Sequence, residues 1–190
     1  NRLSRAFKTV THLGLKQTGL FALYKFGLLT GHYQRVLAQK PQLPESLVLH
    51  SLLALPDKDK ILALLGENGL TELLAEADQI ADYGFYRQFG AEYVSIQLKP
   101  PVDGDLLDWT VYETGKVKVN SEDIKFVWEP ARFGWAVPLA RAYHLTCDAK
   151  YAEKFWQLLE LFQQENPSCK GPNWQSGQEV AVRLVTVLLC

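Results

Sequence analysis

Apolar residues return every three or four positions along most of this chain, and that period is typical of amphipathic helices. On this pattern we predict helices over residues 1–13, 15–29, 58–65 and 71–82 in the first part of the chain. Glycines separate these segments: Gly14 lies between the first two, and Gly66 and Gly69 lie between the last two. Gly31 is expected to end the second segment, and Asp57 is a suitable N-cap for the third.

The pattern changes between residues 83 and 120. Apolar and polar residues alternate over residues 85–89 and 92–98, which is typical of strands. Pro100, Pro101 and Gly104 interrupt the pattern afterwards. We therefore predict a short hairpin followed by an irregular connection.

Helical periodicity returns at Asp123. Glu129 and Pro130 are predicted to open a helix, because proline is tolerated in a first helical turn. Pro138 should bend that helix or mark the first turn of another. The expected fold is mainly α, with a small irregular or β segment around residues 83–120.

A further helix is predicted to start at Asp148 and to end near Glu165. Asp148 is expected to cap it by accepting a hydrogen bond from the Tyr151 N–H, and Asn166-Pro167 should stop it. Two helices joined by so short a turn form a helical hairpin of the kind that repeats in all-α toroids and solenoids, although we find no second copy. The chain ends in the apolar run VRLVTVLLC without a stop signal, so we expect the native protein to continue beyond Cys190.

Composition and net charge make some classes of function less suitable for this chain. Hydrophobic residues make up 47% of the chain and charged residues 22%, as in ordinary globular proteins. The net charge of −1 disfavours nucleic-acid binding, and no apolar run is long enough to span a bilayer. Arg2, Arg5 and Lys8 share one side of the first predicted helix. That side could meet a membrane surface or a polyanion, but a solvated face on a packed helix is the simpler interpretation.

The sequence offers no cofactor or metal motif. Cys147, Cys169 and Cys190 have neither the even number of a disulfide framework nor zinc-ligand spacing, and the four histidines lack the spacing of a metal-binding helix. His144 is expected to be structural. We therefore predict no cofactor and no metal.

A first polar cluster consists of Lys125, Trp128, Glu129 and Arg132. On a helix, Trp128 and Arg132, four residues apart, share one face, and Glu129 lies beside them. An arginine beside a tryptophan could bind a sugar acid, with the guanidinium on the carboxylate and the indole on the ring. The favoured alternative is structural: Arg132 would pair with Glu129 or with loop carbonyls while Trp128 packs in the core.

Two more clusters follow. Asn173, in the loop Gly171-Pro172-Asn173-Trp174, could shape the turn or donate a hydrogen bond to a substrate anion, and the residues do not decide between these roles. Ser176 and Glu179 have the spacing of a capping box, and Arg183 can pair with Glu179 one turn on. A structural role is therefore favoured for Glu179.

The block from Asp123 to Arg183 resembles the heparinase II/III-like polysaccharide lyases, in their N-terminal, alginate-lyase-like α/α toroid domain. The residues that carry the resemblance are Asp123, Lys125, Trp128, Glu129, Arg132, Ala142, Tyr143, Thr146, Asp148, Tyr151, Ala152, Phe155, Asn166, Pro167, Gly171, Asn173, Trp174, Glu179 and Arg183. Cys147 departs from the pattern, which usually has glycine there. Because cysteine does not adopt a positive φ as easily as glycine, this turn is expected to be strained.

The resemblance implies an N-terminal segment, residues 1–120, followed by the first helices of an incomplete α/α toroid, residues 121–190, and then a C-terminal β-sandwich. It implies β-elimination on a uronic-acid-containing acidic glycan, so a carbon–oxygen lyase. Asn173 would neutralise the uronate carboxylate, and Trp174, Arg132, Glu129, Trp128, Glu179 and Arg183 would line or support the cleft. Trp174 takes the place where some relatives carry histidine. The catalytic base would lie beyond Cys190, so these 190 residues alone are expected to show little activity.

The alternative function is a non-catalytic helical protein that binds glycans or assists in the assembly of cell-envelope polysaccharides. A third alternative is a purely structural helical domain. Acidic glycans suggest a periplasmic or secreted protein, with the cytoplasm as the other compartment. The identity of the glycan is open.

Overall fold

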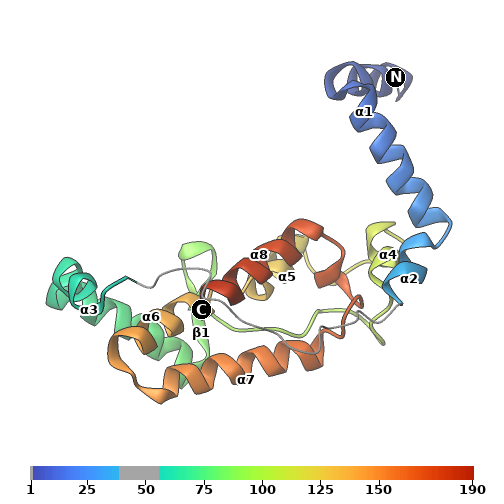
Figure 1. Ribbon diagram of the computed structural model, residues 1–190. Helices are drawn as coiled ribbons and strands as arrows, with labels where there is room; N and C mark the ends of the chain where they lie inside the picture. The colour runs from blue at the N-terminus through green and yellow to red at the C-terminus, as the bar shows by residue number, and fades with distance from the viewer. Residues whose placement is uncertain (1, 39–55) are drawn as a thin grey trace, which may run out of the picture. The chain divides into compact units, whose positions relative to one another are not determined.

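The computed structural model describes residues 2–38 and 56–190, with side chains described from residue 14 (Figure 1). The chain divides into two compact units, Asn1–Glu45 and Ser46–Cys190. The described residues are mainly helical and include one small two-stranded sheet. None of the described helices is both long and apolar enough to cross a membrane.

The first unit contains α1 (Arg2–Leu29) and α2 (His32–Leu37). Gly14, at φ 82° and ψ 160°, breaks the helical geometry of α1, so the predicted division into two helices is confirmed. Gly31 lies in the turn between α1 and α2 at φ 67°, a left-handed conformation that favours glycine. The rings of Tyr24 and Tyr33 bring the two helices together, with 5.6 Å between their centroids.

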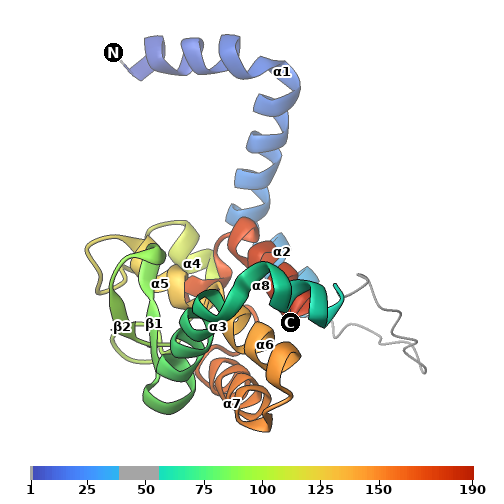
Figure 2. The same ribbon diagram turned by 90° about the vertical axis from the view of Figure 1, so that its left-hand side faces the viewer.

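The second unit is built on three helices: α3 (Lys58–Tyr83), α6 (Ala136–Thr146) and α7 (Ala149–Glu165). Both α3 and α7 pack against α6 (Figure 2). The Asp57 side chain caps α3, as predicted, and Gly66 interrupts the helix at φ 63°. The predicted break at Gly69 is wrong, because helical backbone hydrogen bonding resumes after Gly66 and continues to Tyr83.

The core of this unit combines helix-facing aliphatic residues with a row of aromatic rings. Its fully buried members include Ala77, Ile80, Trp135, Ala136, Leu139 and Ala142. Phe133 contacts both Trp135 and Phe162, with centroid distances of 5.2 and 4.9 Å. On α7, the residues buried in this core are Tyr151, Phe155, Leu158 and Phe162.

The predicted hairpin is present. Strands β1 (Phe85–Arg87) and β2 (Tyr93–Ser95) pair antiparallel, with Tyr86 opposite Val94, and a 3-10 turn, η1 (Gln88–Gly90), joins them. The connection after β2 contains a short helix that the pattern did not reveal, α4 (Trp109–Glu113). Asp108 starts α4 by accepting a hydrogen bond from the Thr110 N–H.

Helix α5 (Ile124–Ala131) corrects one prediction. Pro130 lies in its last turn rather than its first, because Asp123, seven residues before Pro130, caps the helix through the Lys125 N–H. In contrast, Pro138 does lie in the first turn of α6. Cys147 follows α6 at φ 59°, the strained left-handed position that the sequence indicated.

The last elements are the 3-10 turn η2 (Pro172–Trp174) and α8 (Gly177–Leu189). Asp148 caps α7 as predicted, but its side chain accepts from the Lys150 N–H rather than from Tyr151. Asn166 follows Glu165 and ends α7, also as predicted. Residues 56–120 belong to the same compact unit as α5 to α8, and the proposed boundary at residue 120 stays a prediction.

Candidate functional site

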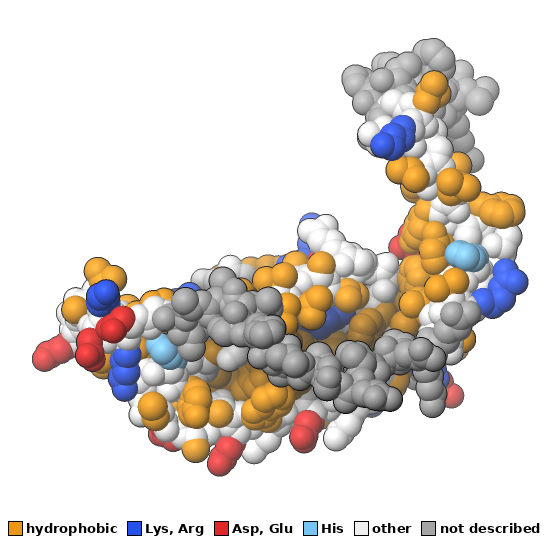
Figure 3. Space-filling model, viewed as in Figure 1, with side chains coloured by type: hydrophobic (Ala, Val, Ile, Leu, Met, Phe, Trp, Pro, Cys, Tyr) orange, Lys and Arg blue, Asp and Glu red, His pale blue; other side chains and the backbone are white. Residues whose placement is uncertain are grey.

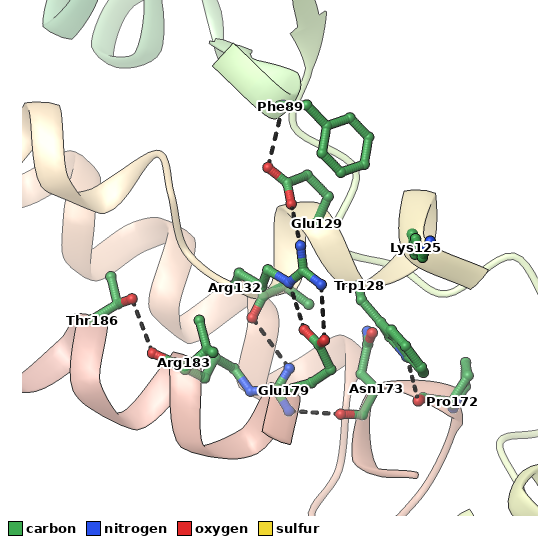
Figure 4. Close-up of polar contacts among 12 residues, drawn as sticks. Phe89, Lys125, Trp128, Glu129, Arg132, Pro172, Asn173, Glu179, Arg183 and Thr186 are labelled. Carbon is green, nitrogen blue, oxygen red and sulfur yellow. Dashed lines mark hydrogen bonds and ion pairs between the residues drawn. The ribbon is translucent and has the colours of Figure 1, made fainter. Parts of the chain in front are cut away.

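The residues singled out from the sequence meet where α5, η2 and α8 pack together (Figure 4). Helix α5 carries Trp128 and Glu129, with Arg132 as its C-cap; η2 carries Asn173 and Trp174; α8 carries Glu179 and Arg183. Lys125 lies apart from this group. The sequence thus selected a real cluster, but its members divide into three groups with different surroundings.

The first group is an ion cluster of Glu129, Arg132 and Glu179. Arg132 binds Glu179 through two parallel hydrogen bonds, from Nε to Oε2 at 2.6 Å and from Nη2 to Oε1 at 2.8 Å. Its Nη1 donates to Glu129 Oε2 at 2.9 Å, and Glu129 Oε1 accepts from the backbone N–H of Phe89 at 3.3 Å. The cluster therefore joins α5, α8 and the β-hairpin.

This arrangement favours a structural role for Arg132. Two carboxylates already occupy all three nitrogens of its guanidinium. Hydrogen bonding to Glu179, with a smaller contribution from Glu129, raises the pKa of Arg132 above its ordinary value. The predicted pairing of Arg132 with Glu129 is confirmed. Three of the five N–H donors of Arg132 are therefore already used by these carboxylates.

Two local predictions about α8 are wrong for the same reason. Ser176 is the N-cap of α8, but its side chain makes no capping hydrogen bond. The Glu179 carboxylate is turned toward Arg132, so it neither completes a capping box nor forms the predicted pair with Arg183. A bidentate bond to a guanidinium is stronger than a capping hydrogen bond, and the Arg183 guanidinium donates to backbone carbonyls instead.

Arg183 is buried, and it donates hydrogen bonds to backbone carbonyls instead of pairing with Glu179. Its Nη2 donates to the Asn173 carbonyl at 2.6 Å and its Nη1 to the Ala131 carbonyl at 3.2 Å. The guanidinium also lies over the rings of Phe162 and Trp174, at 5.0 and 5.2 Å from their centroids. Burial lowers the pKa of Arg183 to about 10, with Glu179 opposing the shift. The carbonyls and ring faces compensate for part of the lost hydration of this cation.

The second group is a buried amide pair, Asn166 and Asn173, each only 1% exposed. Asn166 Nδ2 donates to the carbonyls of Leu98 and Phe162, at 2.9 and 3.0 Å, which fixes the orientation of its amide. Asn166 Oδ1 therefore faces Asn173 and accepts from its Nδ2 at 2.8 Å. Asn166, which the sequence offered only as a helix stop, thus positions Asn173.

The amide oxygen of Asn173 is the notable atom of this pair. It is buried, and no donor in the described part of the chain reaches it. An unpaired buried acceptor costs about 1–3 kcal/mol, so native structures contain few of them. Asn173 Nδ2 carries a second hydrogen besides the one given to Asn166. The side chain can therefore offer one acceptor and one donor to a ligand.

A pocket of about 280 Å³ lies beside Asn173. Its lining includes Gln97, Lys99, Pro101, Ser121, Phe126 and Asn173. Of these residues, Gln97 and Lys99 are exposed and Asn173 is buried. Gln97, Lys99 and Ser121 were missed by sequence reasoning, because they come from the irregular connection and only the fold brings them to Asn173.

The third group is the pair of tryptophans, and neither lines that pocket. Trp128 Nε1 donates to the Pro172 carbonyl at 3.0 Å and thereby holds the Gly171–Trp174 loop against α5. Trp174 Nε1 donates to the Asn166 carbonyl at 3.3 Å. Trp174 and Arg183 instead line a mainly apolar groove of about 590 Å³ next to α7 and α8. Asn173 and Trp174, adjacent in sequence, therefore serve different cavities.

Across residues 2–38 and 56–190, no group of three histidine, cysteine or acidic side chains could hold a metal ion. The three cysteines are free thiols. His144 approaches the Pro56 carbonyl, with 3.3 Å between Nε2 and the oxygen, so it contacts backbone.

Comparison of the chain with models of known protein families, with curated proteins and with solved structures gave no match. The resemblance to the heparinase-like lyases therefore depends on the motif residues alone.

Proposed function

We propose that this chain is the N-terminal part of a polysaccharide lyase that cleaves uronic-acid-containing glycans by β-elimination, with the pocket beside Asn173 as the place where the uronate binds. The observation that carries the proposal is the buried, unpaired amide oxygen of Asn173, a residue that lines a pocket together with Lys99. A uronic acid has a carboxylate beside hydroxyl groups. A site that binds it needs hydrogen-bond donors for the carboxylate and an acceptor for a hydroxyl group.

The residues of the pocket would act on the carboxylate and its neighbours. Lys99 and the second N–H of Asn173 would reduce the negative charge of the carboxylate, which lowers the barrier to removing the adjacent C5 proton. Asn173 Oδ1 would accept a hydrogen bond from a neighbouring sugar hydroxyl. Phe126, which is half exposed, offers an apolar surface for the sugar ring.

The helical arrangement also supports the proposal. Helices α6 and α7 form a hairpin closed at Cys147-Asp148, which is the repeating unit of an α/α toroid. Helix α8 leaves Leu184, Val185 and Leu188 more than half exposed. In a toroid each hairpin is covered by the next, so an apolar outer face of this kind fits the proposed fold.

The non-catalytic alternative needs fewer groups than the lyase. Neither a tyrosine nor a histidine is among the described residues that line the pocket, so a lyase would need a tyrosine or histidine base from another part of the protein. A glycan-binding protein needs only the acceptor, the donor and Lys99. A periplasmic or secreted location, where acidic glycans occur, is the expected compartment for either function.

An elimination assay separates the two functions. The protein as its gene encodes it is mixed with a panel of uronate-containing glycans, and the ultraviolet absorbance of the new C4–C5 double bond is followed. We expect one glycan to be cleaved, and Asn173→Ala to abolish the signal in a protein that remains folded by circular dichroism. Binding without elimination would select the non-catalytic function, and neither binding nor elimination would contradict both.

Lys99 gives a test that spares the fold, because its side chain is exposed. Lys99→Gln should weaken glycan binding roughly tenfold by removing a charge-assisted hydrogen bond. Lys118→Gln, an equally exposed lysine outside the pocket, serves as the matched control. An equal loss of glycan affinity in both variants would mean that binding depends only on the overall charge of the protein.

A further inference from the structure

Basic residues are concentrated at one end of this chain. Residues 1–38 contain six lysines and arginines and not one aspartate or glutamate, whereas the remaining residues contain 14 basic and 21 acidic side chains. The overall net charge of −1 therefore conceals a strongly cationic first unit. Such segregation indicates that this unit has an anionic partner of its own.

The straight part of α1 that follows Gly14 is apolar on two sides. A helix turns about 100° per residue, so Leu15, Ala22 and Leu29 lie in one line, with Leu23 and Phe26 beside them. Tyr24 and Leu28 lie on another side, where Tyr33 of α2 contacts Tyr24 and Leu28 is buried. Helix α2 therefore accounts for only one of the two apolar sides.

No described residue of the first unit covers the other side. Leu15, Leu23, Phe26 and Leu29 are 83%, 67%, 64% and 84% exposed. Figure 3 shows hydrophobic side chains along the described length of this helix. A row of large exposed apolar residues is costly in water and indicates an interaction surface. We call Leu15, Ala22, Leu23, Phe26 and Leu29 the apolar stripe.

Two lysines border the apolar stripe. By the same rotation, Lys16 lies along one edge of the stripe and Lys25 along the other. Lys25 Nζ lies 5.5 and 5.3 Å from the ring centroids of Phe21 and Tyr24, so its charge stays at the level of the helix flank. Lysines that flank an apolar face can keep their ammonium groups in the headgroup layer while the face enters the acyl layer.

We propose that the first unit of this protein binds the surface of an anionic phospholipid membrane, with the apolar stripe of α1 buried at the headgroup boundary and its lysines among the lipid phosphates. The apolar stripe would gain binding energy by contact with the acyl chains, and the lysines beside it by attraction to the anionic headgroups. Nucleic acid would use the charges but leave Leu23 and Phe26 in water. The helix lies on the membrane rather than across it, since none of the described helices is apolar enough to span one.

Vesicle flotation with the full chain tests the proposal. Vesicles of phosphatidylcholine alone are compared with vesicles of equal parts phosphatidylcholine and phosphatidylserine. We expect binding to the anionic vesicles only, and weaker binding as salt rises. Equal binding to both kinds of vesicle, or binding to neither, would overturn the proposal.

Two pairs of variants separate the contributions. Leu23→Gln/Phe26→Gln should abolish flotation, whereas Leu64→Gln/Trp156→Gln, an exposed leucine and aromatic of the second unit, should not change it. Lys16→Gln/Lys25→Gln should weaken binding about fivefold per charge. Lys116→Gln/Lys118→Gln, two exposed lysines of the second unit, is the charge control. All four variants should keep the circular dichroism spectrum of the original protein.

Two other partners of the first unit would give different experimental results. Binding to double-stranded DNA with no flotation would replace the lipid by a nucleic acid. Concentration-dependent self-association that Leu23→Gln/Phe26→Gln removes, again with no flotation, would mean that the apolar stripe pairs with a second copy of this chain. Either result would overturn the membrane proposal.

Discussion

Arg132 shows how a single side chain can connect three elements. Its guanidinium bonds to Glu129 on α5 and to Glu179 on α8, and Glu129 continues to the hairpin through Phe89. Because the Glu179 side chain is only 5% exposed, removing Arg132 leaves a buried carboxylate without the two hydrogen bonds that Arg132 donates to it. Arg132→Ala should therefore lower the free energy of unfolding by about 2 kcal/mol, measured by urea denaturation.

Arg141→Ala provides the comparison, because Arg141 is exposed on α6 and should change the stability little. If Arg132→Ala unfolds at the same urea concentration as the original protein, the ion cluster contributes no stability. That result would favour the alternative, in which Arg132 binds a substrate carboxylate.

Cys147 supports a second prediction at the residue scale. It occupies the left-handed position after α6 at φ 59°, where a side chain with a Cβ atom is strained. Glycine relieves the strain but is more flexible in the unfolded chain, so Cys147→Gly should raise the free energy of unfolding by about 0.5–1 kcal/mol. Cys147→Ala removes the thiol and keeps the strain, so it should leave the urea midpoint unchanged. A midpoint that falls in Cys147→Gly would contradict this reasoning.

At the scale of elements, α3 and α7 are joined by a polar contact on their outer side. Asp78 Oδ1 accepts from Lys150 Nζ at 2.6 Å and from Tyr151 Oη at 2.8 Å. Burial and the hydrogen bond to Asp78 raise the pKa of Tyr151 to about 12, and the same carboxylate raises the pKa of Lys150. At neutral pH all three groups therefore keep the protonation states that the contact needs.

This contact predicts a pH dependence. Burial opposes ionisation of Asp78, but hydrogen bonds from Lys150 and Tyr151 outweigh it and lower its pKa below the ordinary value of 3.8. The unfolded chain then binds more protons than the folded one near that pH, so the contribution is present above it and lost as pH falls. The original protein should lose more stability between pH 6 and pH 3 than Asp78→Asn does.

Urea midpoints at the two pH values measure that difference, and Asp105→Asn, an exposed carboxylate, is the control. The effect should be small because the Asp78 side chain is 40% exposed and solvent screens the pair. If the urea midpoints of all three proteins fall equally between pH 6 and pH 3, other carboxylates cause most of the loss of stability.

At the scale of the whole molecule, the two units should be separable. The core residues from Ala77 to Phe162 all belong to the second unit, and the first unit makes its own contacts between α1 and α2. A chain of residues 46–190 should therefore unfold cooperatively, with a free energy of unfolding within about 0.5 kcal/mol of the original. A non-cooperative transition in this shortened chain would show that the second unit needs the first.

The sequence by itself determined the elements with strong periodicity and strong local signals. The hairpin around residues 85–98, the end of α7 at Asn166 and the Asp57 and Asp148 caps followed from spacing and capping chemistry. These signals act within a few residues, so they survive without knowledge of the fold. The strain at Cys147 was expected from the resemblance, which implies glycine at that position. The polar residues that cluster near α5, η2 and α8 were also visible in the sequence.

Only the tertiary structure decided what those polar residues do. Glu179 had two satisfactory partners nearby in the sequence, Ser176 and Arg183, yet it bonds to Arg132, 47 residues away. Asn173 owes its orientation to Asn166, and its pocket to Lys99 and Ser121. Local spacing shows which contacts a side chain can reach, but burial rewards the strongest pairing available, and long-range packing determines which pairing that is.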